Sequence, residues 1–533
     1  MEAAGEAPVS RPLTLWATVA AAGIVQLPTA AIVVALGTIH GQFNASMAEL
    51  QWAFVAFYIP FTAFLIAAGR LSDIFGRRRA LLLGTAVFAL GSVLAAVAPG
   101  VEVLIAGIAI AGAGGALMMP ASLAMLTNLF TGESRGLAIG LWGAATEVVS
   151  GVGILVGGVL TEQLSWRWIF WVDVIFAVLI AIMALRGSRE SRDPTAPRSV
   201  DLTGVAVIAA ALTCLTLALN EGSGWGWGSL PTVTLFAAGV LLFASLGVVE
   251  RRAKFPLIDF SFFRNRNFTG STIVVFVLDF AFGAAYFFLP IYFEEILGYS
   301  PMQAGLLLLP MTAVMAVSSP LGGRVAARVG PRPPIVTGLA AMAIATYWIS
   351  TLTLSTDYAD LWIPTVLLGF GVGFALTPMN LAAMNAISKD HAGAASGILV
   401  TLSGLGATLG VAVTGAVFQE LQTNRTVSFA ADKGAHITAD QARQLDGLLA
   451  GATNATKALH QIAGSHAAQV HDVAREAFVS ALGTGLKVST AVVLAGLILS
   501  VILMRRMSPA DAQPTIQVLP PPHPRPAPRT ATT

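Results

Sequence analysis

Long apolar runs dominate the hydrophobic pattern of this chain, and short polar segments separate them. A helix that crosses a bilayer needs about 20 mostly apolar residues. Fourteen runs approach or exceed that length, near residues 14–39, 50–69, 80–98, 102–126, 137–161, 167–185, 202–219, 230–249, 270–293, 303–323, 334–354, 361–386, 395–419 and 482–504. The pattern therefore predicts an all-α membrane protein with fourteen transmembrane helices.

Composition supports a membrane protein and excludes several other classes. Of 533 residues, 56% are hydrophobic and 11% are charged, against roughly 25% charged in soluble domains. A net charge of +2 gives no sign of a nucleic-acid partner, and the single cysteine, Cys214, excludes an internal disulfide and a cysteine-based metal cluster. The sequence has no phosphate-binding GxxxxGK[ST] loop. We expect neither an enzyme nor ATP-driven transport, with no cofactor and no metal.

The positions of arginine and lysine predict how the chain is oriented. Basic residues are enriched on the cytoplasmic side of membrane proteins. They cluster after even-numbered runs, as in 70–79, 186–198, 251–266, 324–332 and 505–506, whereas the short loops 40–50 and 220–229 contain none. This alternation places both termini in the cytoplasm. The abundance of alanine, glycine and arginine favours a bacterial source, and hence a multi-pass protein of the bacterial cytoplasmic membrane.

The strongest local motif is GRLSDIFGRRRALLLG, residues 69–84, between the second and third runs. It combines two glycines that allow close helix approach, a carboxylate, and an arginine cluster; the residues are Gly69, Arg70, Asp73, Gly76, Arg77 and Arg78. The stretch closely resembles the signature loop of the major facilitator superfamily. In that family the loop acts as a latch that stabilises the outward-facing state.

Further segments resemble the fourteen-helix drug:proton antiporter branch of that family. They are AGAGGALMMPASLAML (111–126), SWRWIFWVDV (165–174), LPIYFEEILGYSPMQAGLLLLP (289–310), SPLGGRVAARVGPRPP (319–334) and AASGILVTLSGLGATLGVAVTGAVF (394–418). The resemblance implies two pseudo-symmetric six-helix halves around a central cavity, plus two extra linker helices. It also implies a monomeric exporter of amphipathic drugs or antibiotics in exchange for protons. An uncoupled facilitator or importer, or a membrane sensor derived from a transporter, remain alternatives.

The resemblance also predicts a domain organisation. The segments are a cytoplasmic N-terminus (1–13), an N-terminal six-helix half (14–200), two linker helices (201–250), a C-terminal six-helix half (251–505) that includes a polar outer loop (420–478), and a disordered, proline-rich cytoplasmic tail (506–533).

The chain departs from the family at three landmarks. Pro28 stands where the first span usually carries an aspartate, and Ile108 stands where the fourth span usually carries a buried arginine. Ile154 replaces the proline of a Gly-Pro pair in the antiporter motif of the fifth span, in which Gly153, Gly157 and Gly158 are retained as helix-packing positions. Loss of the arginine associated with proton coupling bears on the mechanism rather than on the fold.

Two carboxylates lie deep in apolar runs and are the candidate site residues. A charged group near the bilayer centre costs about 3 kcal/mol unless it faces a cavity, finds a partner or is protonated. Glu147 shares a helix face with Gly151, Ile154 and Gly158, and we predict that it carries the proton, with a structural hydrogen bond as the alternative.

The second carboxylate, Asp279, lies in the run that opens the predicted second half. It shares a helix face with Gly283, Tyr286 and Pro290. We expect Asp279 and Tyr286 to meet the substrate cavity from the side opposite Glu147. For Asp279 a purely structural role is an equal alternative.

Overall fold

The computed structural model describes residues 10–130, 132–192, 202–252, 260–387, 392–433, 437–445, 448–449, 457–459, 461 and 467–504. Every secondary-structure element in these ranges is helical. The segment before residue 10 and the proline-rich tail predicted from 506 onward lie outside the described residues.

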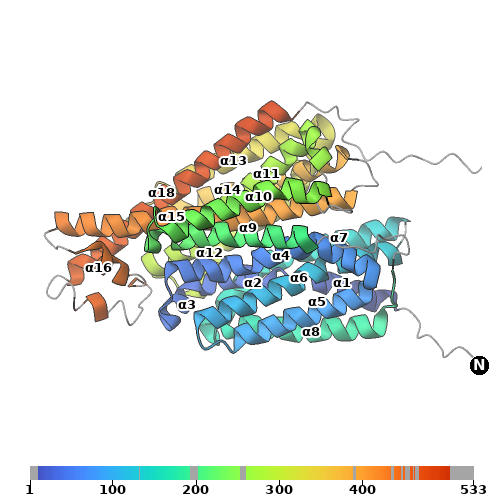
Figure 1. The fold of residues 1–533 in the computed structure, drawn as a ribbon, viewed down its shortest axis with the longest axis horizontal. Coiled ribbons are helices and arrows are strands. Elements are labelled where there is room, and N and C mark those ends of the chain that lie inside the picture. The colour runs from blue at the N-terminus through green and yellow to red at the C-terminus, as the bar shows by residue number, and fades with distance from the viewer. Residues whose placement is uncertain are drawn as a thin grey trace, which may run out of the picture.

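The first group of helices precedes residue 190 and occupies the lower half of Figure 1. It comprises α1 (Arg11–Ile24), α2 (Leu27–Ile32), the 3₁₀ turn η1 (Val33–Ala35), α3 (Leu36–Phe43), α4 (Met47–Phe75), α5 (Arg77–Ala96), α6 (Val101–Leu129), α7 (Gly132–Gln163) and α8 (Arg167–Gly187). Within it, α4 packs on α6, α6 on α5, and α8 on both α5 and α1.

The remaining helices form a hairpin and a second group. The hairpin is α9 (Leu202–Trp225) and α10 (Leu230–Arg252). The second group comprises η2 (Phe260–Arg264), α11 (Arg266–Ile291), the π-helical turn η3 (Tyr292–Ile296), α12 (Pro301–Val329), α13 (Arg332–Ile349), α14 (Tyr358–Asn385), α15 (Ala392–Asp432), α16 (Ala439–Gln444) and α18 (Ala467–Leu503). It fills the upper half of Figure 1, and the green α9 lies between the two groups.

Thirteen helices in the described ranges are long and apolar enough to cross a membrane, so the predicted count of fourteen is not confirmed. The expected run near 334–354 corresponds to α13, which is not among the thirteen. The reason is its composition: α13 has 18 residues, and its first turn includes Arg332 and two prolines. It nevertheless packs lengthwise between α14 and α18.

The first span is broken rather than continuous. It runs from Arg11 to Phe43, but α1 ends at Ile24 and α2 begins at Leu27, with Pro28 in the first turn of α2. Proline has no N–H to donate to the preceding turn, so a helix restarts more easily than it continues at this point. Pro28, at the position for which the resemblance implies an aspartate, thus lies next to the break between α1 and α2.

The polar segment predicted as an outer loop from 420 to 478 contains the ends of two long helices. Helix α15 continues to Asp432, and α18 already begins at Ala467. Together with α16 these ends enclose a separate apolar cluster that includes Ala430, Leu445 and Val473. We call the described residues between 420 and 478 the cap; α16 and the adjoining end of α15 project beyond the bundle at the left of Figure 1.

The two groups meet along two seams. Helix α7 packs against α12, and α4 packs against α15, while α9 touches both α4 and α15. We call the end of the bundle where α4 gives way to α5 at Gly76 the latch end, and the opposite end, where α3 carries His40, the histidine end.

Candidate functional site

A central cavity of about 350 Å³ lies between the two groups. Its lining comes from α2, α4, α6, α7, α11, α12, α14 and α15, and is apolar apart from Gln26, Thr29, Tyr58, Thr146, Ser150, Asp279, Tyr286, Asn380 and Ser403. Asn380, near the end of α14 at the latch end, is exposed. The cavity therefore joins an apolar wall to a few polar groups, an arrangement suited to amphipathic molecules.

Both site residues predicted on α11 reach this cavity. Asp279 and Tyr286 line it, and the phenol of Tyr58, on α4 of the first group, interacts electrostatically with both Asp279 and Tyr286. The Tyr286 hydroxyl is buried and has no hydrogen-bond partner among the described residues. A polar cluster thus bridges the two groups near the middle of the bundle.

The side chain of Glu147 lies outside the described residues, although its backbone belongs to α7. Thr146 and Ser150, on the same stretch of α7, line the central cavity. The face on which Glu147 was predicted packs against α12: a Cβ on Gly151 would lie 3.5 Å from Thr312, and one on Gly158 would lie 2.6 Å from the Pro301 carbonyl oxygen.

The retained glycines of the antiporter motif pack α7 closely on its neighbours. A Cβ on Gly153 would approach the Ala30 side chain to 2.9 Å, and one on Gly157 would approach the Ala31 carbonyl oxygen to 2.4 Å. Gly153 and Gly157 therefore face α2, while Gly158 faces the start of α12. Helix α7 therefore packs both on α2 of its own group and on α12 of the other group.

Two of the departures from the family lie side by side. Pro28 and Ile108 line one narrow space with Phe54 and Phe57, and that space has no room for a water molecule. Both positions are apolar and buried. The chain thus has a tight apolar contact where the resemblance implies an acidic and a basic residue.

The latch residues form bonds within the first group. Arg77 donates to the Asp73 carboxylate through Nε at 3.0 Å and Nη2 at 2.9 Å. The Glu190 carboxylate accepts from the backbone N–H of Arg78, and the Arg78 guanidinium donates to the Leu185 carbonyl near the end of α8.

Gly76 sits at the turn of the latch with φ +117°. This conformation favours glycine, and a Cβ here would also collide with the Glu190 carboxylate. Gly69 packs on Pro120 of α6, and Arg70 follows it on α4. The loop therefore fixes the ends of α4, α5 and α8 relative to one another.

A buried, hydrogen-bonded His–Glu pair that the sequence analysis missed joins the groups at the histidine end. His40 Nδ1 lies 2.8 Å from Glu295 Oε1, and the side chains are 1% and 3% exposed. The adjacent Glu294 packs against Gly37, where a Cβ would collide with its carboxylate. The signals present in the sequence were a histidine at the end of the first run and an acidic pair at the end of the ninth.

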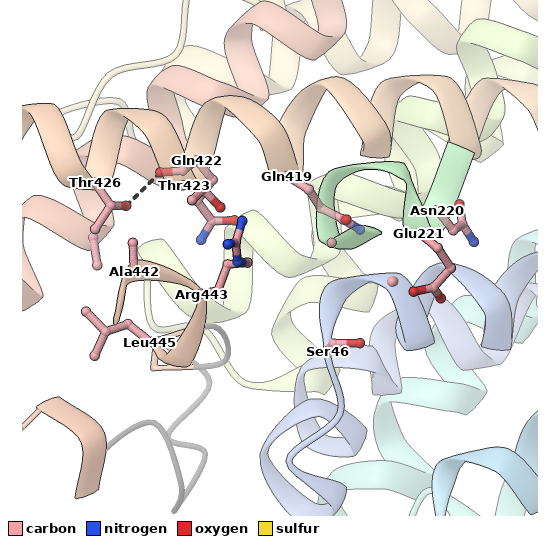
Figure 2. A pocket seen from close by; sticks show the side chains of 13 residues that line it. Ser46, Asn220, Glu221, Gln419, Gln422, Thr423, Thr426, Ala442, Arg443 and Leu445 are labelled. Carbon is pink, nitrogen blue, oxygen red and sulfur yellow. Dashed lines mark hydrogen bonds between the residues drawn. The ribbon is translucent and has the colours of Figure 1, made fainter. Parts of the chain in front are cut away.

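A second, polar cavity of about 230 Å³ lies between the cap and the bundle. Figure 2 shows Glu221 and Asn220 of α9 and Ser46 on one side, with Gln422 of α15 and Arg443 of α16 on the other. The α9–α10 hairpin, α4 and the cap therefore share one water-accessible recess at the histidine end.

Two groups of spanning helices that enclose a central cavity define a membrane transporter rather than an enzyme. The family model described as Major Facilitator Superfamily matches residues 18–411. The chain belongs to this superfamily, and it is an integral membrane protein that handles small-molecule substrates.

Several similar proteins are named for resistance or export. The chain is 29% identical to the tetracenomycin C resistance and export protein of Streptomyces glaucescens, over 94% of this chain and 93% of that protein. It is 32% identical to the multidrug resistance protein Stp of Mycobacterium tuberculosis, over 76% and 75%. It is 33% identical to the puromycin resistance protein pur8 of Streptomyces alboniger, over 77% and 82%.

Solved structures support the same fold. A bacterial homologue of the human lysosomal transporter Spinster, crystallised in an inward-facing and occupied conformation, superposes with a TM-score of 0.65. The alignment covers 94% of this chain and 98% of that chain at 17% identity. At this identity the likeness concerns the fold alone.

Proposed function

We propose that this protein exports amphipathic small molecules across the bacterial cytoplasmic membrane in exchange for protons. The observation that carries the proposal is the central cavity, in whose apolar wall the described residues include one carboxylate, Asp279, and two tyrosines. A cationic amphipathic molecule would bury its apolar part there and place its charge near Asp279. The resistance and export names of the relatives support the outward direction.

The predicted orientation places the latch end in the cytoplasm, together with both termini. In this orientation the buried His40–Glu295 pair and the Gly158–Pro301 contact close the outer side. The structure then corresponds to the state of the transporter that is closed on the outer side and takes up substrate from the cytoplasm. Export requires the histidine end to separate and the latch end to close.

Within this cycle we assign roles to the predicted residues. Glu147 carries the proton, Asp279 and Tyr286 contact the substrate, and the Asp73–Arg77 pair belongs to the latch that stabilises the outward-facing state. Gly153, Gly157 and Gly158 allow α7 to pack against its neighbours. We expect the protein to work as a monomer within the bilayer.

Transport in proteoliposomes tests the proposal. Puromycin is a suitable first probe because it combines an amine with aromatic groups and because a relative is named for resistance to it. We expect uphill puromycin transport when a pH gradient is imposed and only equilibration when it is collapsed. Puromycin transport that is the same with and without the pH gradient would contradict proton exchange, but it would not contradict export.

An uncoupled facilitator is the second candidate, and one observation favours it. Pro28 and Ile108 line one narrow apolar space, at positions for which the resemblance implies an aspartate and an arginine. If Glu147 does not replace those groups, the chain has lost proton coupling. Equal transport with and without the gradient, in both wild type and Glu147→Gln, would establish this alternative.

A further inference from the structure

An apolar cavity separate from the central one lies between the α9–α10 hairpin and α15. Its volume is about 190 Å³, and we call it the hairpin pocket. It is lined by Ile208 of α9, Phe243 and Leu246 of α10, Phe263 of η2, and Ile398, Thr401, Leu402 and Leu405 of α15. The α15 residues lie in its first turns, so the pocket is in the latch-end half of the bundle.

Thr401 is the one polar side chain among these eight. It is 3% exposed, and its Oγ1 has no hydrogen-bond partner among the described residues. Some buried helical threonines donate to the carbonyl four residues earlier, as Thr365 does to Leu361 at 2.9 Å, whereas Thr401 shares its lack of a partner with Thr62, Thr216 and Thr408, none of which lines the hairpin pocket. Because a buried hydroxyl without a partner is costly, Thr401 is an available contact for a molecule in the pocket.

One helix separates the hairpin pocket from the central cavity. Leu399, Val400 and Ser403 of α15 line the central cavity, while Thr401 and Leu402 line the hairpin pocket. The two cavities therefore occupy different faces of the same two turns of α15.

The other wall of the hairpin pocket borders the membrane. Helix α10 packs along α9, and its side chains Val240, Leu241 and Val248 are all more than half exposed. In a bilayer such a surface contacts lipid. A molecule dissolved in the adjacent leaflet is separated from the pocket by α10 alone.

We propose that the hairpin pocket binds the apolar part of an amphipathic molecule that comes from the bilayer, with Thr401 as its hydrogen-bonding contact. The pocket is then a temporary binding site, which we call the waiting site, on the path of the molecule from the membrane to the central cavity. The proposal deepens, and rests on, the exporter function above, because only a transported amphipathic molecule needs such a route. A molecule of this class reaches high concentration in the leaflet that α10 faces.

Cysteine accessibility in bilayers tests the site without requiring turnover. In a Cys214→Ala background, Thr401→Cys is compared with Ser403→Cys, a matched control two residues away that faces the central cavity. The reagents are pyrenyl maleimide, which partitions into lipid, and a charged methanethiosulfonate, which does not. We expect Thr401→Cys to react at least tenfold faster with the maleimide, and Ser403→Cys to react well with the charged reagent.

Protection identifies the occupant. The neutral aromatic amine N-phenyl-1-naphthylamine should slow labelling of Thr401→Cys severalfold, and Leu402→Trp, which fills the pocket, should abolish this protection. Leu405→Cys lines the same pocket and serves as a second reporter should Thr401→Cys fold poorly. Labelling by the charged reagent at the rate of Ser403→Cys, or no labelling of either pocket cysteine, would overturn the inference.

These results are separable from those on export. Puromycin transport with an unreactive pocket refutes only the waiting site. A protected pocket in a protein that transports nothing refutes the exporter function, and with it the route, while the site itself remains.

Discussion

Removal of one partner from the His40–Glu295 pair should open the histidine end. The pair is almost fully buried and joins α3 to η3 across the two groups at 2.8 Å. Removing one partner of a buried hydrogen-bonded pair costs about 1–3 kcal/mol, because the other group stays desolvated and loses that bond. When the groups separate at this end, both side chains are hydrated. The substitution therefore destabilises the closed state and not the open state.

The expected magnitude follows from this difference. At about 1.4 kcal/mol per factor of ten, a loss of ~3 kcal/mol, the upper end of this range, shifts the equilibrium toward the open state by roughly a hundredfold. Glu295→Leu should show a shift of up to this size. The double variant His40→Leu/Glu295→Leu should recover much of the closure, since replacing both partners of a buried hydrogen bond by apolar groups costs little.

The assay is the accessibility of the central cavity from the histidine side. Ser150→Cys, which lines the cavity on α7, is introduced into the Cys214→Ala background and labelled in intact cells with an impermeant reagent. We expect the labelling rate to rise by up to two orders of magnitude in Glu295→Leu. Glu476→Gln is the control, because the Lys433–Glu476 pair has a similar length of 3.0 Å but is 44% exposed on both sides. Unchanged labelling in Glu295→Leu would refute a gating role for the pair.

Three further predictions concern the residues identified from sequence. Asp73→Asn removes the negative charge that pairs with Arg77 and should lower the transport rate several-fold without reducing the amount of protein in the membrane; wild-type turnover would contradict the latch assignment. Glu147→Gln, which mimics the protonated form, should abolish uphill export while downhill exchange persists, and should abolish substrate-induced proton release from detergent-purified protein; release equal to wild type would leave Glu147 a structural role. Gly157→Ala should lower thermal stability by about 1–3 kcal/mol of overpacking, whereas Gly143→Ala, on the same helix but with no atom within 4 Å of the added Cβ, should be neutral or stabilising; equal melting temperatures would contradict the close approach of α7 to α2.

The approximate extent of the spans was predictable because the hydropathy of a helix depends on whether lipid or water surrounds it. The run near 50–69 lies within α4. The start of α4 is marked by the Ser46–Glu49 capping box, in which each side chain accepts a hydrogen bond from the backbone N–H of the other residue. The same reasoning failed beyond residue 419. There the side chains become polar but keep their helix propensity, so the change in polarity does not mark the end of α15, which continues to Asp432.

The site was predictable only in part. Asp279 and Tyr286 stood out because a polar residue in an apolar run needs a reason, and both line the cavity. His40 and Glu295 are separated by 255 positions, and nothing in their local spacing indicates that they meet. The proximity of Pro28 and Ile108 was hidden for the same reason, since each substitution looked like an independent loss until the structure showed that both line one narrow space.

Because α15 is long, a small tilt of this helix displaces the cap by a large distance. Its 41 residues correspond to a rod of about 60 Å at ~1.5 Å per residue, roughly twice the thickness of the hydrocarbon core. Helix α18 packs beside α15, and Lys433 pairs with Glu476. A tilt of α15 by about 10° about its latch end would therefore move the tip through roughly 10 Å. A fluorophore on the cap would therefore report each swing of the second group while the transport path stayed free of labels.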